Sequence, residues 1–381
     1  MRLRSVGGSP SRARESSLFD MAMRVRETRK DSVTRFEEEF SRYVGAKYAI
    51  AVNSATSGLM IVMMALLRKP GDKVITTPMT FSATSNAVLC GGGIPAFADI
   101  NPSSLCIDQR TVSAKVDSKC MGVLVVDLYG FPAVTDSLKE LCEEKGMFIV
   151  EDAAQALGSI RNGRSVGSLS EATVFSFFQS KQLAIGEGGM ITTNDALLAN
   201  KFKMIRSHGQ DRQYHQIMLG YNFRMPEKLA NDGLSGLHSI GSLIRKRVQI
   251  SRIYREILDE VEGLVLPVHE MGVKNSYYKF PLVLKLPISK VRRISLVTAG
   301  ATNAHIGRGY DVLVYQQPFY RKIQRLFWGA SVVPYPNYSR WHCPSAEFAI
   351  HRIVELPTDS TVSEEKAVLI ASALKNSMKN A

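Results

Sequence analysis

Short apolar runs alternate with amphipathic stretches through the first half of the chain. Phe36, Phe40 and Tyr43 recur at helical spacing before Gly45, and the next apolar run has the length of a buried strand. Repeated alternation of this kind predicts a parallel sheet with helices on both faces. The predicted strands are 48–52, 73–77, 96–99, 121–126 and 147–150, and the predicted helices are 31–45, 57–67, 81–89 and 138–145.

A long helical stretch from 229 to about 261 follows. Gly233, Gly236 and Gly241 lie within it, and each glycine lowers helical propensity by about 1 kcal/mol relative to alanine. Beyond this stretch, prolines break the sequence into shorter pieces. The change of character predicts that a second folding unit begins inside the long helix.

These patterns divide the chain into three expected regions. Residues 1–30 are Arg-rich, and because acidic residues interrupt the run we interpret it as an N-terminal arm lying against a neighbouring subunit rather than a transit peptide. Residues 31–245 form the predicted large domain. Residues 246–381 form a predicted smaller α/β domain, with a strand at 278–286 and an amphipathic helix at 364–378.

Composition narrows the possible classes of function. The chain has 381 residues, 45% hydrophobic and 22% charged, and its longest apolar runs are too short to cross a bilayer. Five scattered cysteines without a Cys-x-x-Cys pair favour a reducing, cytoplasmic compartment. Seven histidines without His-Glu-x-x-His spacing give no support to a metal site. We therefore expect neither a membrane partner nor a metal.

The net charge of +13 is the one unusual feature of the composition. A basic surface attracts nucleic acid, membranes or a diphosphate-bearing small molecule. The sequence contains no helix-turn-helix signal and no RNA-binding signature, so we expect no nucleic-acid partner.

Polar side chains follow the ends of two apolar runs that we expect to be neighbouring strands. The run 147–150 leads to Asp152 and Gln155, and the next run carries Ser176 and leads to Lys181. Open α/β sheets bind ligands at the carboxyl ends of their strands. A lysine that binds an aldehyde covalently and a carboxylate that keeps a pyridine nitrogen protonated are what pyridoxal phosphate (PLP) requires. The stretch therefore predicts a PLP site.

Each of these residues also has a purely structural interpretation. Asp152 is a favourable helix N-cap, Ser176 suits a small core position, and Lys181 suits a solvated turn. The combination favours chemistry, because burying an acid and an amine side by side is unfavourable unless both are used.

Two further segments supply a candidate phosphate site and a candidate ring face. The turn 53–58, Asn-Ser-Ala-Thr-Ser-Gly, lies between a strand and an apolar helix, where backbone N–H groups and the helix dipole favour an anion. A plain N-cap explains the same residues. Phe81 follows the end of the next strand, where an aromatic ring either stacks on a flat cofactor or fills the core.

Several motifs share their order and spacing with one known family. They are Asn-Ser-Ala-Thr-Ser at 53–57, Thr-Phe-Ser-Ala-Thr at 80–84, Glu-Asp-Ala-Ala-Gln at 151–155, Phe-Ser-Phe-Phe-Gln-Ser-Lys at 175–181, Gly-Glu-Gly-Gly at 186–189, Arg-Ser-His-Gly at 206–209 and Gly-Tyr-Asn-Phe-Arg-Met at 220–225. From about Phe36 to its end, the chain resembles the DegT-type (StrS-like) family of PLP-dependent nucleotide-sugar aminotransferases. The resemblance implies an aspartate-aminotransferase fold, PLP fold type I, with a mostly parallel large-domain sheet and a small C-terminal domain.

The resemblance also implies a role for each residue around the cofactor ring. Lys181 would be the Schiff-base lysine, and Asp152 would pair with the pyridine nitrogen. Gln155 would hydrogen-bond the ring hydroxyl, and Phe81 would stack on the ring.

Four other residues would hold the cofactor phosphate. Ala55 and Thr56 would bind it through backbone and hydroxyl groups, with help from Ser176. Asn222 would reach the phosphate of the neighbouring subunit, because members of the family are homodimers with shared active sites.

The activity implied by the resemblance is transfer of an amino group to a keto-sugar carried on a nucleotide, with glutamate as the expected donor. Asp127 stands where relatives often have histidine, and Asp359 where they have the histidine of a Leu-Pro-x-His motif. These departures leave the substrate open, including the sugar and the aminated carbon. The alternatives are a PLP-dependent sugar dehydratase of the same family, some members of which replace the lysine by histidine, and a regulatory protein that kept the fold without catalysis.

Overall fold

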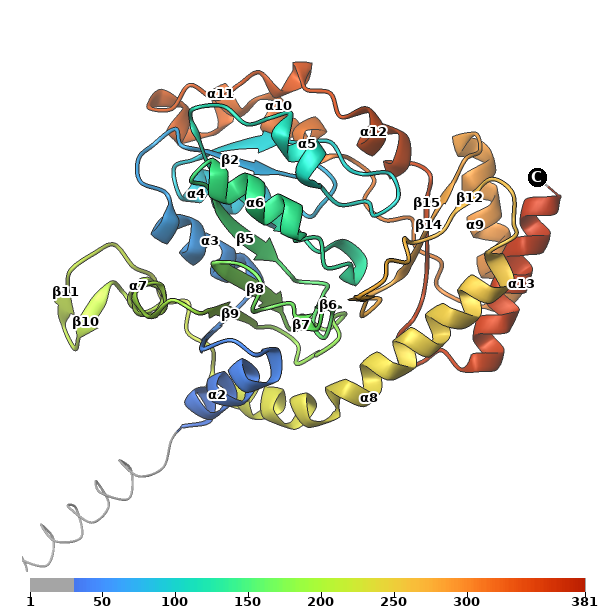
Figure 1. The fold of residues 1–381 in the computed structure, drawn as a ribbon, viewed down its shortest axis with the longest axis horizontal. Helices are drawn as coiled ribbons and strands as arrows, with labels where there is room; N and C mark the ends of the chain where they lie inside the picture. Colours follow the sequence, from blue (N-terminus) through green and yellow to red (C-terminus); the bar gives the residue numbers. More distant parts are fainter. Residues whose placement is uncertain (1–30, 381) are drawn as a thin grey trace, which may run out of the picture.

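A seven-stranded sheet lies at the centre of the structure, which is a computed structural model describing residues 31–380 (Figure 1). Its strands are β1 (Tyr48–Val52), β2 (Lys73–Thr76), β3 (Ile94–Phe97), β4 (Cys120–Val126), β5 (Phe148–Asp152), β8 (Ala172–Ser176) and β9 (Gly189–Thr193). Their order is β1-β9-β8-β5-β4-β2-β3, and only β9 runs antiparallel to its neighbours. The prediction of a mostly parallel sheet is confirmed.

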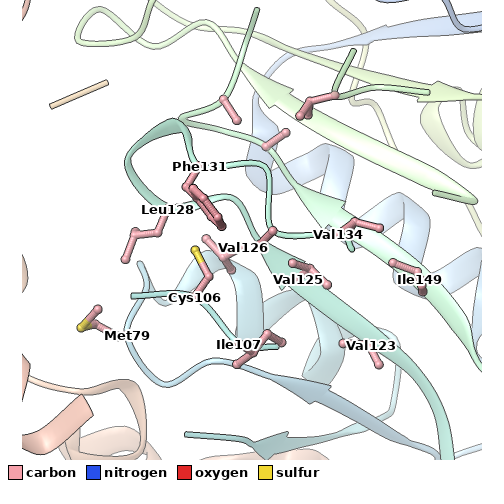
Figure 2. Packing of buried hydrophobic residues seen from close by; sticks show 14 of the residues in the cluster. Met79, Cys106, Ile107, Val123, Val125, Val126, Leu128, Phe131, Val134 and Ile149 are labelled. Carbon is pink, nitrogen blue, oxygen red and sulfur yellow. The ribbon is translucent and has the colours of Figure 1, made fainter. Parts of the chain in front are cut away.

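Helices cover both faces of this sheet. They are α2 (Ser32–Val44), α3 (Ala55–Leu66), α4 (Ala83–Cys90), α5 (Gln109–Ser113), α6 (Asp136–Glu144), α7 (Ala196–Arg206) and α8 (Glu227–Leu258). Buried side chains of α3, α4 and α7 form one core with alternate strand residues, and those of α2, α5, α6 and α8 form a second core on the opposite face. Figure 2 shows part of the second core, where Val123 and Val125 of β4 lie near Ile149 of β5.

The first helix illustrates how local sequence sets the element boundaries. The Asp31 side chain accepts a 2.7 Å hydrogen bond from the Thr34 N–H and caps α2, and Gly45, at a φ of 73°, ends it in the left-handed conformation. Phe36 and Phe40 are fully buried. The helix predicted over 31–45 is thus confirmed.

Several predicted boundaries, among them those of α4 and β3, differ from the observed ones by about two residues. The helix predicted over 81–89 begins at Ala83, because Phe81 turns outward instead of joining it. The strand predicted over 96–99 is β3, which ends at Phe97. The Asp99 carboxylate accepts hydrogen bonds of 2.9 Å from two backbone N–H groups at the start of a later helix, α12 (Pro344–Ile350), so the chain leaves the sheet before Asp99.

The long helix α8 forms despite its glycines. Gly233 lies against the ring of Phe36, and Gly236 lies against Leu183. The glycines therefore lower the helical propensity of α8 but allow α2 and the loop around Leu183 to approach it closely. Figure 1 shows α8 running beneath the large sheet from α2 toward the C-terminal helix.

A second, three-stranded antiparallel sheet forms a separate core in the C-terminal part. Its strands are β12 (Leu264–Val265), β14 (Phe280–Leu284) and β15 (Ile353–Leu356), in the order β12-β14-β15. The end of α8, together with α9 (Ile288–Thr302) and α13 (Glu364–Lys379), contributes to that core. The expected α/β fold class is confirmed, whereas a division at residues 245 and 246 stays a prediction.

The segment between α9 and β15 packs back onto the large sheet. Tyr338 donates a hydrogen bond of 2.8 Å from its hydroxyl to the Pro95 carbonyl, and Trp341 Nε1 donates one of 2.8 Å to the Phe97 carbonyl. This segment covers the edge strand β3, which would otherwise expose unpaired backbone groups. It contains α10 (Pro318–Arg321), α11 (Ile323–Leu326) and α12.

The remaining strands are short and lie outside the two main sheets. Figure 1 shows the hairpin of β10 and β11 projecting from the body of the protein. Their bounds are β6 (Ile160–Arg161), β7 (Arg164–Ser165), β10 (Gln210–Arg212), β11 (His215–Gln216) and β13 (Val273–Lys274). The predicted arm 1–30 lies outside the described residues. Within residues 31–380, none of the helices combines the length and the apolar character needed to cross a membrane.

The close approach of α8 to α2 can be tested with two alanine substitutions. A Cβ atom at Gly233 would lie 2.6 Å from Phe36 Cζ, so we expect Gly233→Ala to lower the free energy of unfolding by about 1–3 kcal/mol through overpacking. At Gly241 of the same helix a Cβ atom would meet only the flexible end of Arg245, at 3.5 Å, so Gly241→Ala should raise stability by up to about 1 kcal/mol. Urea unfolding of both variants measures the difference, and equal effects would contradict this packing.

Candidate active site

A cavity of about 510 Å³ opens at the carboxyl ends of β4, β5 and β8 and is closed on its other side by residues of the C-terminal part. Of the residues singled out from the sequence, those lining it are Ala55, Thr56, Phe81, Asp152, Gln155, Ser176 and Lys181. Segments separated by more than a hundred residues therefore meet in one site, as expected for an open α/β sheet.

Asp152 is the acid at the end of β5. Its side chain is buried, its Oδ2 accepts a 2.7 Å hydrogen bond from the Thr84 hydroxyl, and its Oδ1 accepts a 3.2 Å bond from the Ala154 N–H. Burial raises the pKa of Asp152, and the two hydrogen bonds and the charge of Lys181 oppose that rise. No helix begins at Asp152, so the interpretation of this residue as an N-cap is wrong.

Lys181 is half-buried in the loop that follows β8. Its Nζ lies 4.6 Å from the centre of the Tyr278 ring, which belongs to the C-terminal part of the chain. Burial lowers the pKa of the Lys181 amine, while the charge of Asp152 opposes the decrease. The interpretation as a solvated turn is therefore wrong, and the amine is favoured in its uncharged form relative to an exposed lysine.

The aromatic side chains near Lys181 come from two distant parts of the chain. Phe177 is fully buried and packs against Phe36 and Phe40, behind the loop, so it does not line the cavity. Phe178 does line it, together with Tyr278. The ring of Tyr278 comes from a segment whose proximity the sequence pattern did not indicate.

Hydrogen bonds hold the Lys181 loop in place. The Phe177 N–H donates to the Gly188 carbonyl at 2.9 Å, and the Lys181 N–H donates to the Phe178 carbonyl at 2.8 Å. Gln182 is buried, and its Nε2 donates to the Gln155 carbonyl at 2.5 Å. The residue after the lysine thus ties the loop to the segment that follows β5, a role that sequence reasoning missed.

The turn before α3 provides free backbone donors. Ser54 is the N-cap of α3, and its side chain accepts a 3.1 Å hydrogen bond from the Ser57 N–H. The turn is therefore an N-cap, as one of its two interpretations predicted. The N–H groups of Ala55 and Thr56 have no acceptor among residues 31–380. A helix N-terminus with free N–H groups beside a cavity suits a phosphate.

Gly189 is required where β9 approaches this turn. A Cβ atom there would lie 2.7 Å from the Ala55 backbone nitrogen and 2.9 Å from the Phe175 carbonyl oxygen. Gly189 therefore allows β9 to lie close to both the turn 53–58 (the phosphate turn) and the end of β8.

Gln155 is fixed by a residue in a strained conformation. The Tyr129 N–H donates a 2.7 Å hydrogen bond to Gln155 Oε1, and Gln155 Nε2 lies 3.4 Å from the Tyr310 hydroxyl. Tyr129 has a φ of 57°, which is uncommon for a residue with a bulky side chain. Strain of this kind is found at functional sites, where surrounding contacts hold the residue in place.

Phe81 and Ser176 lie at the cavity wall, and Asn222 does not. The Phe81 ring is 63% exposed in the single chain, so it does not fill the core. Asn222 is exposed, and its neighbours Tyr221 and Phe223 stack on each other, with ring centres 4.9 Å apart, on the opposite side of the extended segment. In this chain Asn222 therefore contributes nothing to the cavity that the other predicted residues line.

Sequence reasoning missed the wall that the C-terminal part supplies. Its residues, spread over the last hundred positions of the chain, are Tyr278, Lys279, Gly309, Tyr310 and Glu355. Thr84 was also missed as the partner of Asp152, because the two residues lie 68 positions apart in the sequence. Asp127 and Asp359, which stand where relatives often have histidine, do not line this cavity.

The arrangement fits PLP. A cavity of about 510 Å³ lies within the usual range for small-molecule sites. It presents free N–H groups for a phosphate, a buried carboxylate for a ring nitrogen, and a half-buried amine beside Tyr278 of the C-terminal part. Among the described residues, no three His, Cys, Asp or Glu side chains gather where they could hold a metal ion.

Relatives of known activity resemble the chain over most of its length. UDP-N-acetyl-3-dehydro-alpha-D-glucosamine 3-aminotransferase of Acidithiobacillus ferrooxidans is 30% identical, over 90% of this chain and 87% of the relative. UDP-2-acetamido-2-deoxy-3-oxo-D-glucuronate aminotransferase of Pseudomonas aeruginosa is 34% identical, over 71% of this chain and 75% of the relative.

The fold has solved counterparts as well. The structure of Helicobacter pylori PseC, an aminotransferase involved in the biosynthesis of pseudoaminic acid, matches with a TM-score of 0.83 at 26% identity over 93% of each chain. This likeness confirms the aspartate-aminotransferase type of fold. The sequence model described as "DegT/DnrJ/EryC1/StrS aminotransferase family" matches residues 20–375, as the motif resemblance predicts. The chain therefore belongs to the DegT/DnrJ/EryC1/StrS aminotransferase family.

Proposed function

We propose that this protein binds PLP in the cavity and transfers an amino group to a keto-sugar carried on a nucleotide. The observation that carries the proposal is that Asp152 and Lys181 face one cavity closely enough for each to shift the pKa of the other. The names of the two curated relatives support the choice of a nucleotide-linked keto-sugar as substrate.

Each cofactor-binding residue has a proposed task. Asp152 holds a proton on the pyridine nitrogen, and Gln155 accepts or donates at the ring hydroxyl. Phe81 stacks on one face of the ring, which explains why a large aromatic side chain is exposed beside a cavity. Ala55 and Thr56 hold the phosphate through their free N–H groups, with Ser176 beside them.

Bound PLP supplies a ring that withdraws electrons from the reacting carbon of the substrate. Lys181 would hold the cofactor covalently at rest and, when released, its Nζ would accept and return a proton. To accept this proton Nζ must be uncharged, and the lowered pKa of Lys181 favours that form. The presence of Lys181 also favours amino transfer over the dehydratase reaction, and the intact pair with Asp152 counts against a non-catalytic regulatory protein.

Glutamate is the proposed amino donor. Lys279 lines the cavity and supplies a cation for a donor carboxylate, with Asp359 Oδ2 lying 3.9 Å from its Nζ. Both half-reactions share this cavity, so donor and sugar bind in turn.

A homodimer completes the proposed site, with Asn222 reaching the phosphate bound by its partner. The exposure of Asn222 and its distance from its own cavity support this assignment. Sedimentation equilibrium tests it, and a monomeric holoenzyme would contradict it.

The five cysteines are free thiols in the structure, which is compatible with the proposed cytoplasmic location.

The purified protein reconstituted with PLP should show a visible absorbance that disappears when glutamate is added. The reason is that glutamate displaces Lys181 and leaves the amino group on the cofactor. Adding the keto-sugar nucleotide should restore the absorbance, and Lys181→Ala should abolish both changes. A band that glutamate leaves unchanged would count against aminotransfer, and turnover by Lys181→Ala would refute the assignment of the lysine.

The hydrogen bond from Thr84 should control the pH range of cofactor binding. This bond lowers the pKa of buried Asp152, so Thr84→Val should raise that pKa further. During acidification, the Asp152 carboxylate of the variant should therefore become protonated at a higher pH than that of the wild type. We expect the Kd for PLP to rise about 10-fold at pH 8, and more at pH 6. Thr84→Ser, which keeps the hydroxyl, is the matched control, and absorbance titration at both pH values provides the measurement. If Thr84→Val and Thr84→Ser lost the same PLP affinity at both pH values, the hydrogen bond from Thr84 would not have this role.

A further inference from the structure

One carboxylate in the wall of the cavity has no cation beside it. Glu355, in β15, lines the cavity, and its Oε1 accepts a 2.7 Å hydrogen bond from the Tyr129 hydroxyl. Within residues 31–380, no nitrogen of Lys, Arg or His lies within 4.0 Å of this carboxylate, and its Oε2 receives no hydrogen bond. Glu355 therefore brings a carboxylate with no cation beside it to the wall of the cavity.

Of the other charged side chains that line the cavity, Asp152, Lys181 and Lys279 already have tasks. Asp152 and Lys181 are assigned to the cofactor. Lys279, whose Nζ lies 3.9 Å from Asp359 Oδ2, is assigned to the carboxylate of the amino donor. Glu187 is exposed in the loop after Lys181. On the C-terminal wall, Glu355 is thus the charge left for a substrate.

The position of Glu355 is fixed on both sides. Its backbone pairs with Gly307 through two hydrogen bonds, of 3.0 Å and 2.8 Å. A Cβ atom at Gly309 would lie 3.0 Å from the Tyr129 hydroxyl oxygen and 3.5 Å from Glu355 Oε1, so glycine there keeps the space around the carboxylate open.

Tyr129 places this carboxylate relative to the cofactor-binding residues. The same residue whose hydroxyl holds Glu355 donates its N–H to Gln155, and its carbonyl accepts a 3.1 Å bond from the Tyr278 N–H. Through Tyr129, Glu355 is therefore linked to Gln155, which lines the same cavity beside Tyr310.

We propose that Glu355 determines specificity by accepting hydrogen bonds from the hydroxyl groups of a neutral keto-sugar and by excluding keto-sugars that carry a carboxylate. This inference rests on the proposed function. A carboxylate forms strong hydrogen bonds with hydroxyl donors. A sugar carboxylate directed at Glu355 would be repelled at close range, whereas the carboxylate of the amino donor is assigned to Lys279 on the same wall. To judge by their names, the relative from Acidithiobacillus ferrooxidans acts on a neutral keto-sugar and the one from Pseudomonas aeruginosa acts on a keto-sugar with a carboxylate.

The test compares two UDP-linked 3-keto-hexosamines that differ only at C6, which is a hydroxymethyl group in one and a carboxylate in the other. The wild-type holoenzyme should have the higher kcat/KM for the neutral sugar. Glu355→Gln keeps the size of the side chain and removes its charge, so the ratio of the two kcat/KM values should fall at least about 10-fold, mainly through KM. Calorimetric titration of both sugars into each protein gives the same comparison without turnover.

Glu347→Gln is the matched control. Glu347 Oε1 also accepts a short bond, 2.6 Å, from a tyrosine hydroxyl, that of Tyr315, but it does not line the cavity, so the ratio should stay at the wild-type value. A wild-type preference for the acidic sugar, or an unchanged ratio in Glu355→Gln, would overturn the inference while leaving aminotransfer intact. A wild-type protein whose absorbance glutamate does not alter would instead refute the proposed function, and the binding ratio would still test Glu355.

Discussion

Placing a carboxylate and an amine together in a partly dry cavity is the constraint on which the rest of the structure depends. Burial raises the pKa of Asp152 and lowers that of Lys181, so each charge is disfavoured unless the other, or a ligand, compensates it. The parallel pairing of β5 with β8 brings the two residues to the same sheet edge. Thr84 then adds the hydrogen bond that keeps the acid oriented.

The remaining elements position this pair and enclose it. Phe177 anchors the lysine loop in the core against α2, and Gly189 lets β9 pass close to the phosphate turn. The C-terminal part closes the cavity with tyrosines and with Glu355, whose place is set by the strained Tyr129. The proposed cofactor-binding groups thus come from the large sheet and the loops that follow its strands, and the proposed substrate-facing groups come mainly from the C-terminal part.

The sequence predicted the elements whose signals are local and missed those that depend on distant contacts. Apolar runs and caps located β1, β2, β4 and α2, and strand-end polar residues located Asp152, Gln155 and Lys181. Neither Thr84 nor Glu355 has a local signal of function, because each acquires its partner only when segments 68 and 226 positions apart meet. Asn222 lies outside the cavity of its own chain, and its proposed partner is a phosphate bound by a second copy.

The most direct test of the account is to locate the lysine that binds PLP. The reconstituted protein would be reduced with borohydride, digested and analysed by mass spectrometry. We predict one stable pyridoxyl adduct, on the peptide that contains Lys181, and its loss in Lys181→Ala. An adduct on Lys279, which lines the same cavity, or no specific adduct at all, would contradict the central claim.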